Sequence, residues 1–255
     1  ARSLAEGLGV MAGVSTLAVA ERAGAHAVSS WVRRNAPGFA GLAEPIGHLA
    51  TLGPVALLVW GGLEGVYRRT EHGGAAVESA YSAPPTSRAA SGGPASSISW
   101  ETLGREGRRF VNMTMAAKEI TAVTGQRAKE PVRVFIGLDS AATVDARVST
   151  AMDELEALGA FDRSLLCLAA PTGTGYVNYV VAETLEYLTE GDCAIVAMQY
   201  SLRPSFLSLD RVHLGREQNR VLLHAINGRL RATPAHARPR LVALGESLGA
   251  FTLQD

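Results

Sequence analysis

Residues 245–249 of the chain read Gly-Glu-Ser-Leu-Gly, a spacing of residue types that can carry acyl-transfer chemistry. In the Gly-x-Ser-x-Gly pattern the serine lies on a sharp turn between a strand and a helix. The two glycines allow the turn and the close packing of the helix that follows it. We therefore interpret Ser247 as a candidate nucleophile, with Gly245, Glu246 and Gly249 completing the turn. The alternative is a serine that only caps a helix.

An acyl-transfer site also needs N–H groups that hold the oxyanion of the tetrahedral intermediate. The N–H of Leu248 would lie at a helix amino terminus, which favours negative charge. The loop after the apolar run 164–171 supplies the other candidates, which are Thr172, Gly173, Thr174 and Gly175. In this chemistry the second donor follows a strand two before the nucleophile strand, and this loop has that position. A plain glycine turn is the alternative.

Phosphate binding by the same loop is a further alternative. The loop lacks the Gly-Lys-Ser/Thr of a P-loop, and Gly173 and Gly175 lack the third glycine of a dinucleotide motif. We expect no cofactor and no metal. Two other loops follow apolar runs. Arg203 and Phe206 are interpreted as a substrate entrance, against an ordinary loop. Asp139 and its neighbour Ser140 are interpreted as a helix cap, against a site carboxylate.

These residues follow apolar runs that alternate with amphipathic stretches. Such alternation predicts an α/β fold with a mostly parallel sheet and helices on both faces, in which ligands bind at the carboxyl ends of the strands. The expected strands are 132–138, 164–171, 193–200 and 238–245. The expected helices are 100–125 in two pieces, 144–159, 176–189 and 215–232.

The first 71 residues are predicted to be a helical transmembrane region. A helix over 41–63 is long enough to cross a bilayer core of ~30 Å. Trp60 and the pair Arg68 and Arg69 lie near its end, where interfacial rings and cations are common. Residues 8–33 are a second candidate span. The alternative is a pair of buried helices in a soluble domain.

Composition separates this region from the rest of the chain. Residues 72–99 are rich in Gly, Pro, Ala and Ser, which predicts a flexible linker before a globular domain over 100–255. The chain has 24 basic and 24 acidic side chains, so we expect no nucleic-acid partner. Cys167 and Cys193 lie in apolar runs and are expected to be buried thiols.

Several segments carry a resemblance to a known family: GRRFV, VRVFIGLDSA, AFDRSLLCLAAPTGTGYVN, QYSLRPSFLSL and RPRLVALGESLGA. They resemble the actinobacterial membrane-anchored alpha/beta-hydrolase family, which joins a multi-helix transmembrane region to a serine-hydrolase domain. The resemblance implies an integral protein of the cell membrane in which Ser247 attacks an ester or acyl substrate. We expect that substrate to be apolar and lipid-like. The alternative is a catalytically silent, membrane-tethered interaction module with a hydrolase fold.

The sequence does not show which residues would activate Ser247. In this fold an acid and then a histidine follow the serine along the chain. All six histidines precede Ser247, at positions 26, 48, 72, 213, 224 and 236. We therefore expect the acid and the histidine in a C-terminal part of the same protein, and interpret 100–255 as the N-terminal part of the hydrolase domain. Cleavage near residue 255, with the remainder associating separately, is the alternative.

Overall fold

The computed structural model describes residues 2–254, without the side chains of 2–10, 12–14 and 72–75. It has two compact units, Ala1–Arg68 and Arg69–Asp255. The first unit consists of α1 (Arg2–Asn35), the short 3₁₀ helix η1 (Pro37–Leu42) and most of α2 (Ala43–Ala75). Both stretches in which membrane helices were expected are therefore helical.

Helices α1 and α2 approach each other closely near the turn that joins them. A Cβ atom on Gly47 would lie only 2.4 Å from the carbonyl oxygen of Ala25, so this position accepts no side chain. Nearby, Glu21 accepts a hydrogen bond of 3.1 Å from Thr51 and lies 2.7 Å from Nδ1 of His48. Small residues and interhelical hydrogen bonds are the usual means of packing helices in a membrane.

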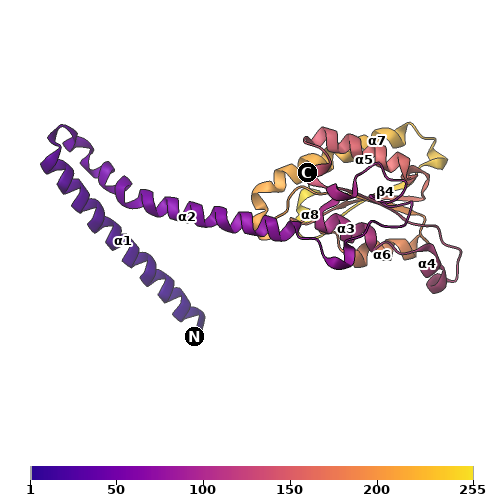
Figure 1. Ribbon diagram of the computed structural model, residues 1–255, viewed down its shortest axis with the longest axis horizontal. Coiled ribbons are helices and arrows are strands. Elements are labelled where there is room, and N and C mark those ends of the chain that lie inside the picture. The colour runs from indigo at the N-terminus through magenta and orange to yellow at the C-terminus, as the bar shows by residue number, and fades with distance from the viewer. Residues whose placement is uncertain (1, 255) are drawn as a thin grey trace. The chain divides into compact units, whose positions relative to one another are not determined.

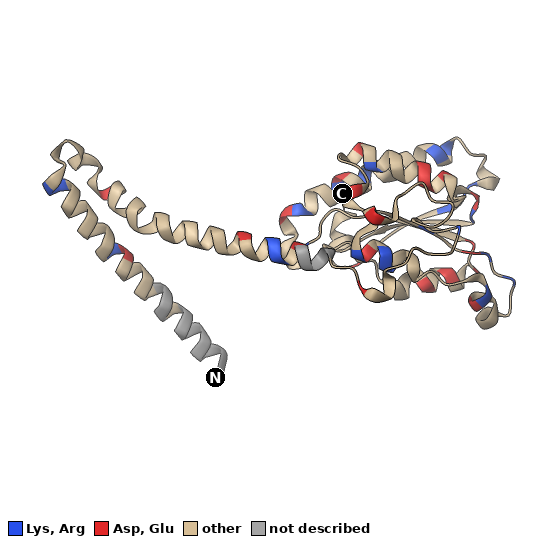
Figure 2. Ribbon diagram, viewed as in Figure 1, with Lys and Arg blue, Asp and Glu red and all other residues tan. Residues whose placement is uncertain are grey.

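Helix α2 exposes most of its apolar side chains. The segment Pro37–Glu71 is long and apolar enough to cross a membrane, and it is the one such segment in the described part of the chain. The second candidate span, 8–33, includes residues whose side chains lie outside the described part, so it stays a prediction. Leu57 and Leu58 are 73% and 77% exposed. Figure 2 shows no charged residue along the middle of this helix. A continuous exposed apolar surface of this kind marks contact with lipid or protein.

The second unit is built on a four-stranded parallel sheet, as the alternating pattern predicts. Its strands are β1 (Val132–Ile136), β2 (Leu165–Ala170), β3 (Cys193–Met198) and β4 (Arg240–Gly245). The order across the sheet is β1-β3-β2-β4, so β2 lies directly beside β4. Periodicity predicts the strands but not their order, which the crossover connections decide.

Helices cover both faces of this sheet, as expected. On one face α5 packs against α7, and on the other α4 packs against α6, while α3 contacts β1 (Figure 1). The short helix α8 follows β4 and contacts α7. The bounds are α3 Gly104–Asn112, α4 Ala117–Thr124, α5 Val144–Ala157, α6 Tyr179–Leu188, α7 Val212–Arg231 and α8 Leu248–Thr252.

A buried ion pair joins the layers. Arg133 of β1 and Glu186 of α6 are both fully buried, with Nε and Oε1 2.7 Å apart. Arg133 also donates a hydrogen bond of 2.8 Å to the carbonyl oxygen of Phe110 in α3. Because removal of one partner would leave a buried charge uncompensated, this pair constrains how α3 and α6 sit on the sheet.

The expectation of a flexible linker over 72–99 is wrong for its second half. The N–H of Ser91 donates to the carbonyl oxygen of Arg133, and the N–H of Arg133 donates to that of Ala89, each over 2.9 Å. This adds a bridge to the edge of β1. Ser96 and Ser97 donate to the buried carboxylate of Glu154. The small and hydroxyl-bearing residues that suggest a linker here let the backbone lie against the sheet.

The expected cap at the end of β1 is also displaced along the chain. Helix α5 begins at Val144, and the residue that caps it is Thr143, whose hydroxyl oxygen accepts from the N–H of Ala146. Asp139 and Ser140 instead form a short 3₁₀ turn, with the Ser140 hydroxyl 3.5 Å from that of Thr102.

Both cysteines are buried thiols, as predicted. Burial raises the pKa of Cys167 to about 12 and that of Cys193 to about 11. Because a thiol with a raised pKa is almost fully protonated at pH 8, and because neither sulfur is accessible, we expect no reaction with Ellman's reagent in the folded protein. Two thiols should react after unfolding in guanidinium. Rapid modification of the native protein would contradict this burial.

Candidate active site

The candidate nucleophile lies on a strained turn at the end of the sheet. Strand β4 ends at Gly245, helix α8 begins at Leu248, and Ser247 between them has φ 53° and ψ −125°. A positive φ is rare for a residue with a side chain, and strain of this kind collects at functional sites. The side chain of Ser247 is exposed. The turn thus holds a hydroxyl outside the packed core.

Backbone contacts explain both glycines of the turn. A Cβ atom on Gly249 would lie 2.2 Å from the carbonyl oxygen of Ala170, at the end of β2. A Cβ atom on Gly245 would lie 2.6 Å from the backbone nitrogen of Ala250. Since neither distance leaves room for a carbon atom, helix α8 can pack this closely only with glycine at both positions.

The loop after β2 lies beside this turn. Ala170 of β2 pairs with Gly245 of β4, so the residues that follow each strand emerge side by side. Asn178, at the end of the loop, donates a hydrogen bond of 2.8 Å from Nδ2 to the carboxylate of Glu246. Glu246 is exposed and thereby connects the turn to the loop. The two segments that sequence analysis selected for acyl chemistry are brought together.

The backbone N–H groups of this loop differ in whether they are engaged. Thr172 donates to the carbonyl oxygen of Tyr176 and Gly175 donates to that of Thr172, each over 2.9 Å. Gly173 donates to the hydroxyl of Ser205 over 3.4 Å. The N–H of Thr174 donates to no described group, and the same holds for Leu248 in the turn. Thr174 and Leu248 are therefore the two candidate donors left for an oxyanion.

Gln199, at the end of β3, fixes the peptide of Thr174. Its side chain is 2% exposed and donates a hydrogen bond of 2.7 Å to the carbonyl oxygen of Thr174. A Cβ atom on Gly175, which has φ 95°, would clash with the same side chain at 2.7 Å. Gln199 was not among the site residues expected from sequence. Its position directly after an apolar strand, beside the loops already selected, is the signal that could have found it.

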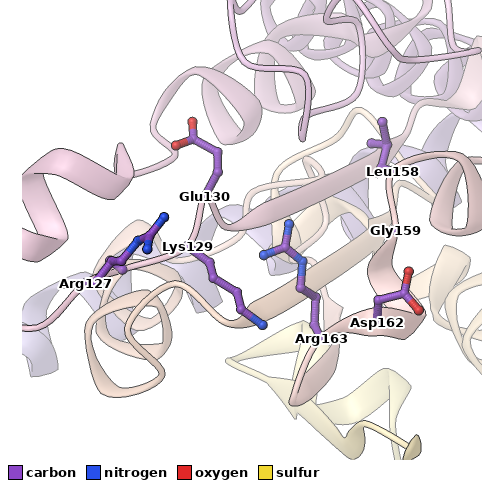
Figure 3. A pocket seen from close by; sticks show the side chains of 8 residues that line it. Arg127, Lys129, Glu130, Leu158, Gly159, Asp162 and Arg163 are labelled. Atoms are coloured by element: carbon purple, nitrogen blue, oxygen red, sulfur yellow. The ribbon is translucent and has the colours of Figure 1, made fainter.

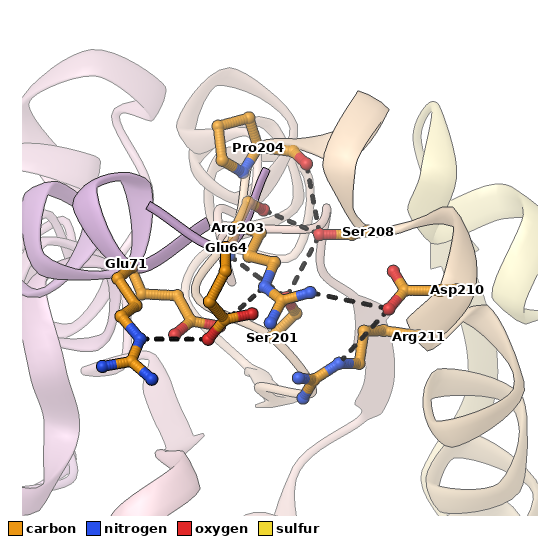
Figure 4. A network of polar contacts seen from close by, with 9 residues as sticks. Glu64, Glu71, Ser201, Arg203, Pro204, Ser208, Asp210 and Arg211 are labelled. Atoms are coloured by element: carbon orange, nitrogen blue, oxygen red, sulfur yellow. Dashed lines mark hydrogen bonds and ion pairs between the residues drawn. The ribbon is translucent and has the colours of Figure 1, made fainter. Parts of the chain in front are cut away.

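Arg203 and Phe206, interpreted from sequence as a substrate entrance, have different surroundings. Arg203 is a structural ion-pair partner: its Nε lies 2.6 Å from the carboxylate of Glu71, its Nη1 lies 3.5 Å from that of Asp210, and its side chain is only 12% exposed (Figure 4). Phe206 is 74% exposed. Of the two residues, Phe206 alone presents its side chain to an incoming molecule.

The histidines do not complete the site. Helix α7 begins near the carboxyl ends of the strands, since Val212 in its first turn packs with Leu248. His213 therefore lies at the same end as Ser247, while His224 lies further along the helix. No histidine whose side chain is described donates or accepts a hydrogen bond with Ser247. Among the described residues, no group of three His, Cys, Asp or Glu side chains is placed to hold a metal ion.

A sizeable groove lies elsewhere in the second unit. It has a volume of about 690 Å³, and Figure 3 shows Lys129 and Arg163 beside it. Lys129 precedes β1 and Arg163 precedes β2, so the groove is at the amino ends of the strands, away from Ser247. Its size is no argument for catalysis, because ligands of open α/β sheets bind at the opposite edge.

Comparisons with known proteins agree with this fold. Residues 132–255 match the model of an alpha/beta-hydrolase family, and residues 1–114 match the model of the N-terminal region of an alpha/beta-hydrolase family. Together these matches cover nearly all of the chain, which therefore belongs to the alpha/beta-hydrolase family. Searches of curated proteins and of solved structures give no match.

The contact of Gly249 with the end of β2 can be tested by adding one methyl group. Gly249→Ala should lower the free energy of unfolding by about 1–3 kcal/mol, because the methyl group has no room beside the Ala170 carbonyl. Gly228→Ala in α7 is the control, since nothing lies within 4 Å of a Cβ there. That change should be neutral or stabilising by up to ~1 kcal/mol. Equal melting temperatures for the two variants would contradict the packing of α8.

Proposed function

We propose that the protein is a serine hydrolase anchored in the cell membrane, acting on an apolar ester or acyl substrate through an acyl-enzyme on Ser247. Membership of the alpha/beta-hydrolase family indicates hydrolase activity. The observation that carries the finer proposal is the strained backbone of Ser247, an exposed residue at the end of β4, next to the strand whose following loop contains Thr174.

The proposed reaction uses the described groups in two roles. The Ser247 oxygen forms a bond to the substrate carbonyl carbon, and the electron pair of the carbonyl moves to its oxygen. The N–H groups of Leu248 and Thr174 then stabilise that oxyanion. Collapse of the intermediate expels the alcohol, whose oxygen receives the proton that the general base took from Ser247, and leaves an acyl-serine that water hydrolyses. A general base must take the proton of Ser247, and the family pattern assigns that role to a histidine.

Anchoring in the membrane is proposed from α2. Its exposed apolar side chains continue for a length that crosses a bilayer, and Arg68 and Arg69 follow where the chain would leave the hydrocarbon. The hairpin of α1 and α2 has its polar contact between Glu21 and His48 on facing surfaces. Such pairing is how ionisable groups are accommodated beside lipid.

The nucleophile can be tested with a fluorophosphonate probe on the whole protein. The probe should label the native sequence, and Ser247→Ala should lose at least about 99% of the labelling and of the esterase rate, since among the described residues Ser247 is the one serine with a positive φ. Ser140→Ala is the matched control, because Ser140 also follows a strand at this edge. Labelling that persists in Ser247→Ala would reject the assignment. Absence of labelling in the native protein would favour a silent interaction module.

The anchor can be tested by extraction of membranes with alkaline carbonate. We expect the protein to stay in the membrane pellet. Replacing both Leu57 and Leu58 by Lys should release a large fraction of it, because each charge near the bilayer centre costs about 2.5–3.5 kcal/mol on insertion scales. Leu188→Lys, at an equally exposed position in α6, should not change the distribution. Extraction of the unaltered protein by carbonate would reject membrane insertion.

A further inference from the structure

The loop between β3 and α7 exposes two large apolar side chains. Phe206 is 74% exposed and Leu209 is 66% exposed, and each belongs to a short 3₁₀ turn, Ser205–Leu207 or Leu209–Arg211. The two side chains lie only three positions apart on one loop, and exposed apolar side chains that lie together can mark a site of interaction with a membrane or a protein.

This loop is held in shape by hydrogen bonds around a buried serine. Ser208 is fully buried, and its hydroxyl lies 2.9 Å from the carbonyl oxygen of Arg203 and 3.1 Å from that of Pro204 (Figure 4). The hydroxyl of Ser201 lies 3.1 Å from the hydroxyl of Ser208 and accepts from the N–H of Arg203. Because Ser208 separates the two turns, Phe206 and Leu209 are presented outward by an ordered backbone.

At one end of the loop, Arg203 forms an ion pair with Glu71, the last residue of the apolar segment Pro37–Glu71. The carboxylate of Glu71 lies 2.6 Å from Nε of Arg203, an ion pair within the second unit. Arg69 lies two residues before Glu71, at the position where a membrane helix commonly carries cations. A chain that leaves the bilayer at this point would therefore keep the loop close to the bilayer surface.

The loop also contacts the segment Thr172–Gly175, which contains the candidate oxyanion donor Thr174. A Cβ atom on Gly173 would lie 2.7 Å from the hydroxyl oxygen of Ser208 and 2.8 Å from the carbonyl oxygen of Arg203. The N–H of Gly173 also donates to the hydroxyl of Ser205. The segment before Thr174 and the loop with the two apolar side chains are thus in direct backbone contact.

We infer that Phe206 and Leu209 insert into the lipid surface, so that the substrate is a membrane-embedded acyl lipid that reaches Ser247 without crossing bulk water. The inference rests on the proposed function for the substrate, and on the contacts of Glu71 and Gly173 for the position of the loop. Asp210 and Arg211 beside Leu209 carry opposite charges. Arg203, the other cation of the loop, is paired with Glu71. These four groups together have no charge excess that would select an anionic lipid, so insertion should depend on apolar contact.

Fluorescence quenching by lipid can test the position of the loop. The environment-sensitive dye NBD is attached to the whole protein, as Phe206→Cys or Leu209→Cys, in phosphatidylcholine vesicles with and without spin-labelled phosphatidylcholine. The native cysteines are buried and should not take up the dye. Leu188→Cys is the matched control, because Leu188 is also apolar, 77% exposed and in the second unit, but lies at the opposite end of α6 from the site.

Insertion predicts that spin-labelled lipid lowers the emission at positions 206 and 209 by about two-fold or more, since inserted side chains lie ~5–10 Å below the headgroup boundary. Emission at position 188 should not change. Equal quenching at 206 and 188 would overturn the inference. A blue-shifted emission at 206 that spin-labelled lipid does not quench would also overturn it, and would assign the surface to a protein partner.

A kinetic measurement separates this inference from the proposed function. In Phe206→Ser/Leu209→Ser, the ratio of the rate on a vesicle-embedded ester to the rate on a water-soluble ester should fall about ten-fold. An unchanged ratio would reject delivery from the membrane. If Ser247 fails to react with the fluorophosphonate probe, the proposed function fails, while the quenching experiment still decides whether the loop enters lipid.

Discussion

The close contact of Gly249 with the carbonyl oxygen of Ala170 is the constraint on which the candidate site depends. It seats α8 against the end of β2, and the chain between β4 and α8 turns through Ser247, which has a positive φ. Such strain costs roughly 1–3 kcal/mol and must be offset by surrounding packing. Leu248 packs with Tyr200 and Val212, and Thr252 donates a hydrogen bond of 2.8 Å to the carbonyl oxygen of Gly249.

Support for the site continues outward from this contact, strand by strand. The loop after β2 is joined to the turn through Asn178 and Glu246, and the segment after β3 supports that loop through Gln199 and Ser205. The segment after β3 restricts the conformations of the loop after β2, and that loop in turn restricts the turn that carries Ser247. Preorganised donors stabilise a developing charge without reorganisation during the reaction, so this layered support favours the electrostatic role proposed for the two free N–H groups.

Much of the fold was predictable from sequence, because continuous apolar strands and amphipathic helices have distinct periods. The Gly-x-Ser-x-Gly turn was predictable because few residue types tolerate its backbone. Other features depend on contacts that sequence does not show. The small residues before Ile98 resemble a linker until the carboxylate of Glu154 is found among their hydroxyl groups. Arg203 pairs with Glu71, which is 132 positions away in the chain, and no local pattern predicts that pairing. The N–H of Thr174 can be recognised as unengaged only once the hydrogen bonds of Thr172, Gly173 and Gly175 are known.

The sheet topology gives an independent reason to place the chemistry between β2 and β4. These strands are neighbours, but α6, which follows β2, and α8, which follows β4, pack on opposite faces of the sheet. In open α/β sheets, ligands bind at the carboxyl ends of strands where successive connections leave to opposite faces. Thr174 follows one of these strands and Leu248 follows the other. The crossover order, which no local sequence pattern encodes, therefore places the two unengaged N–H groups on either side of one strand boundary.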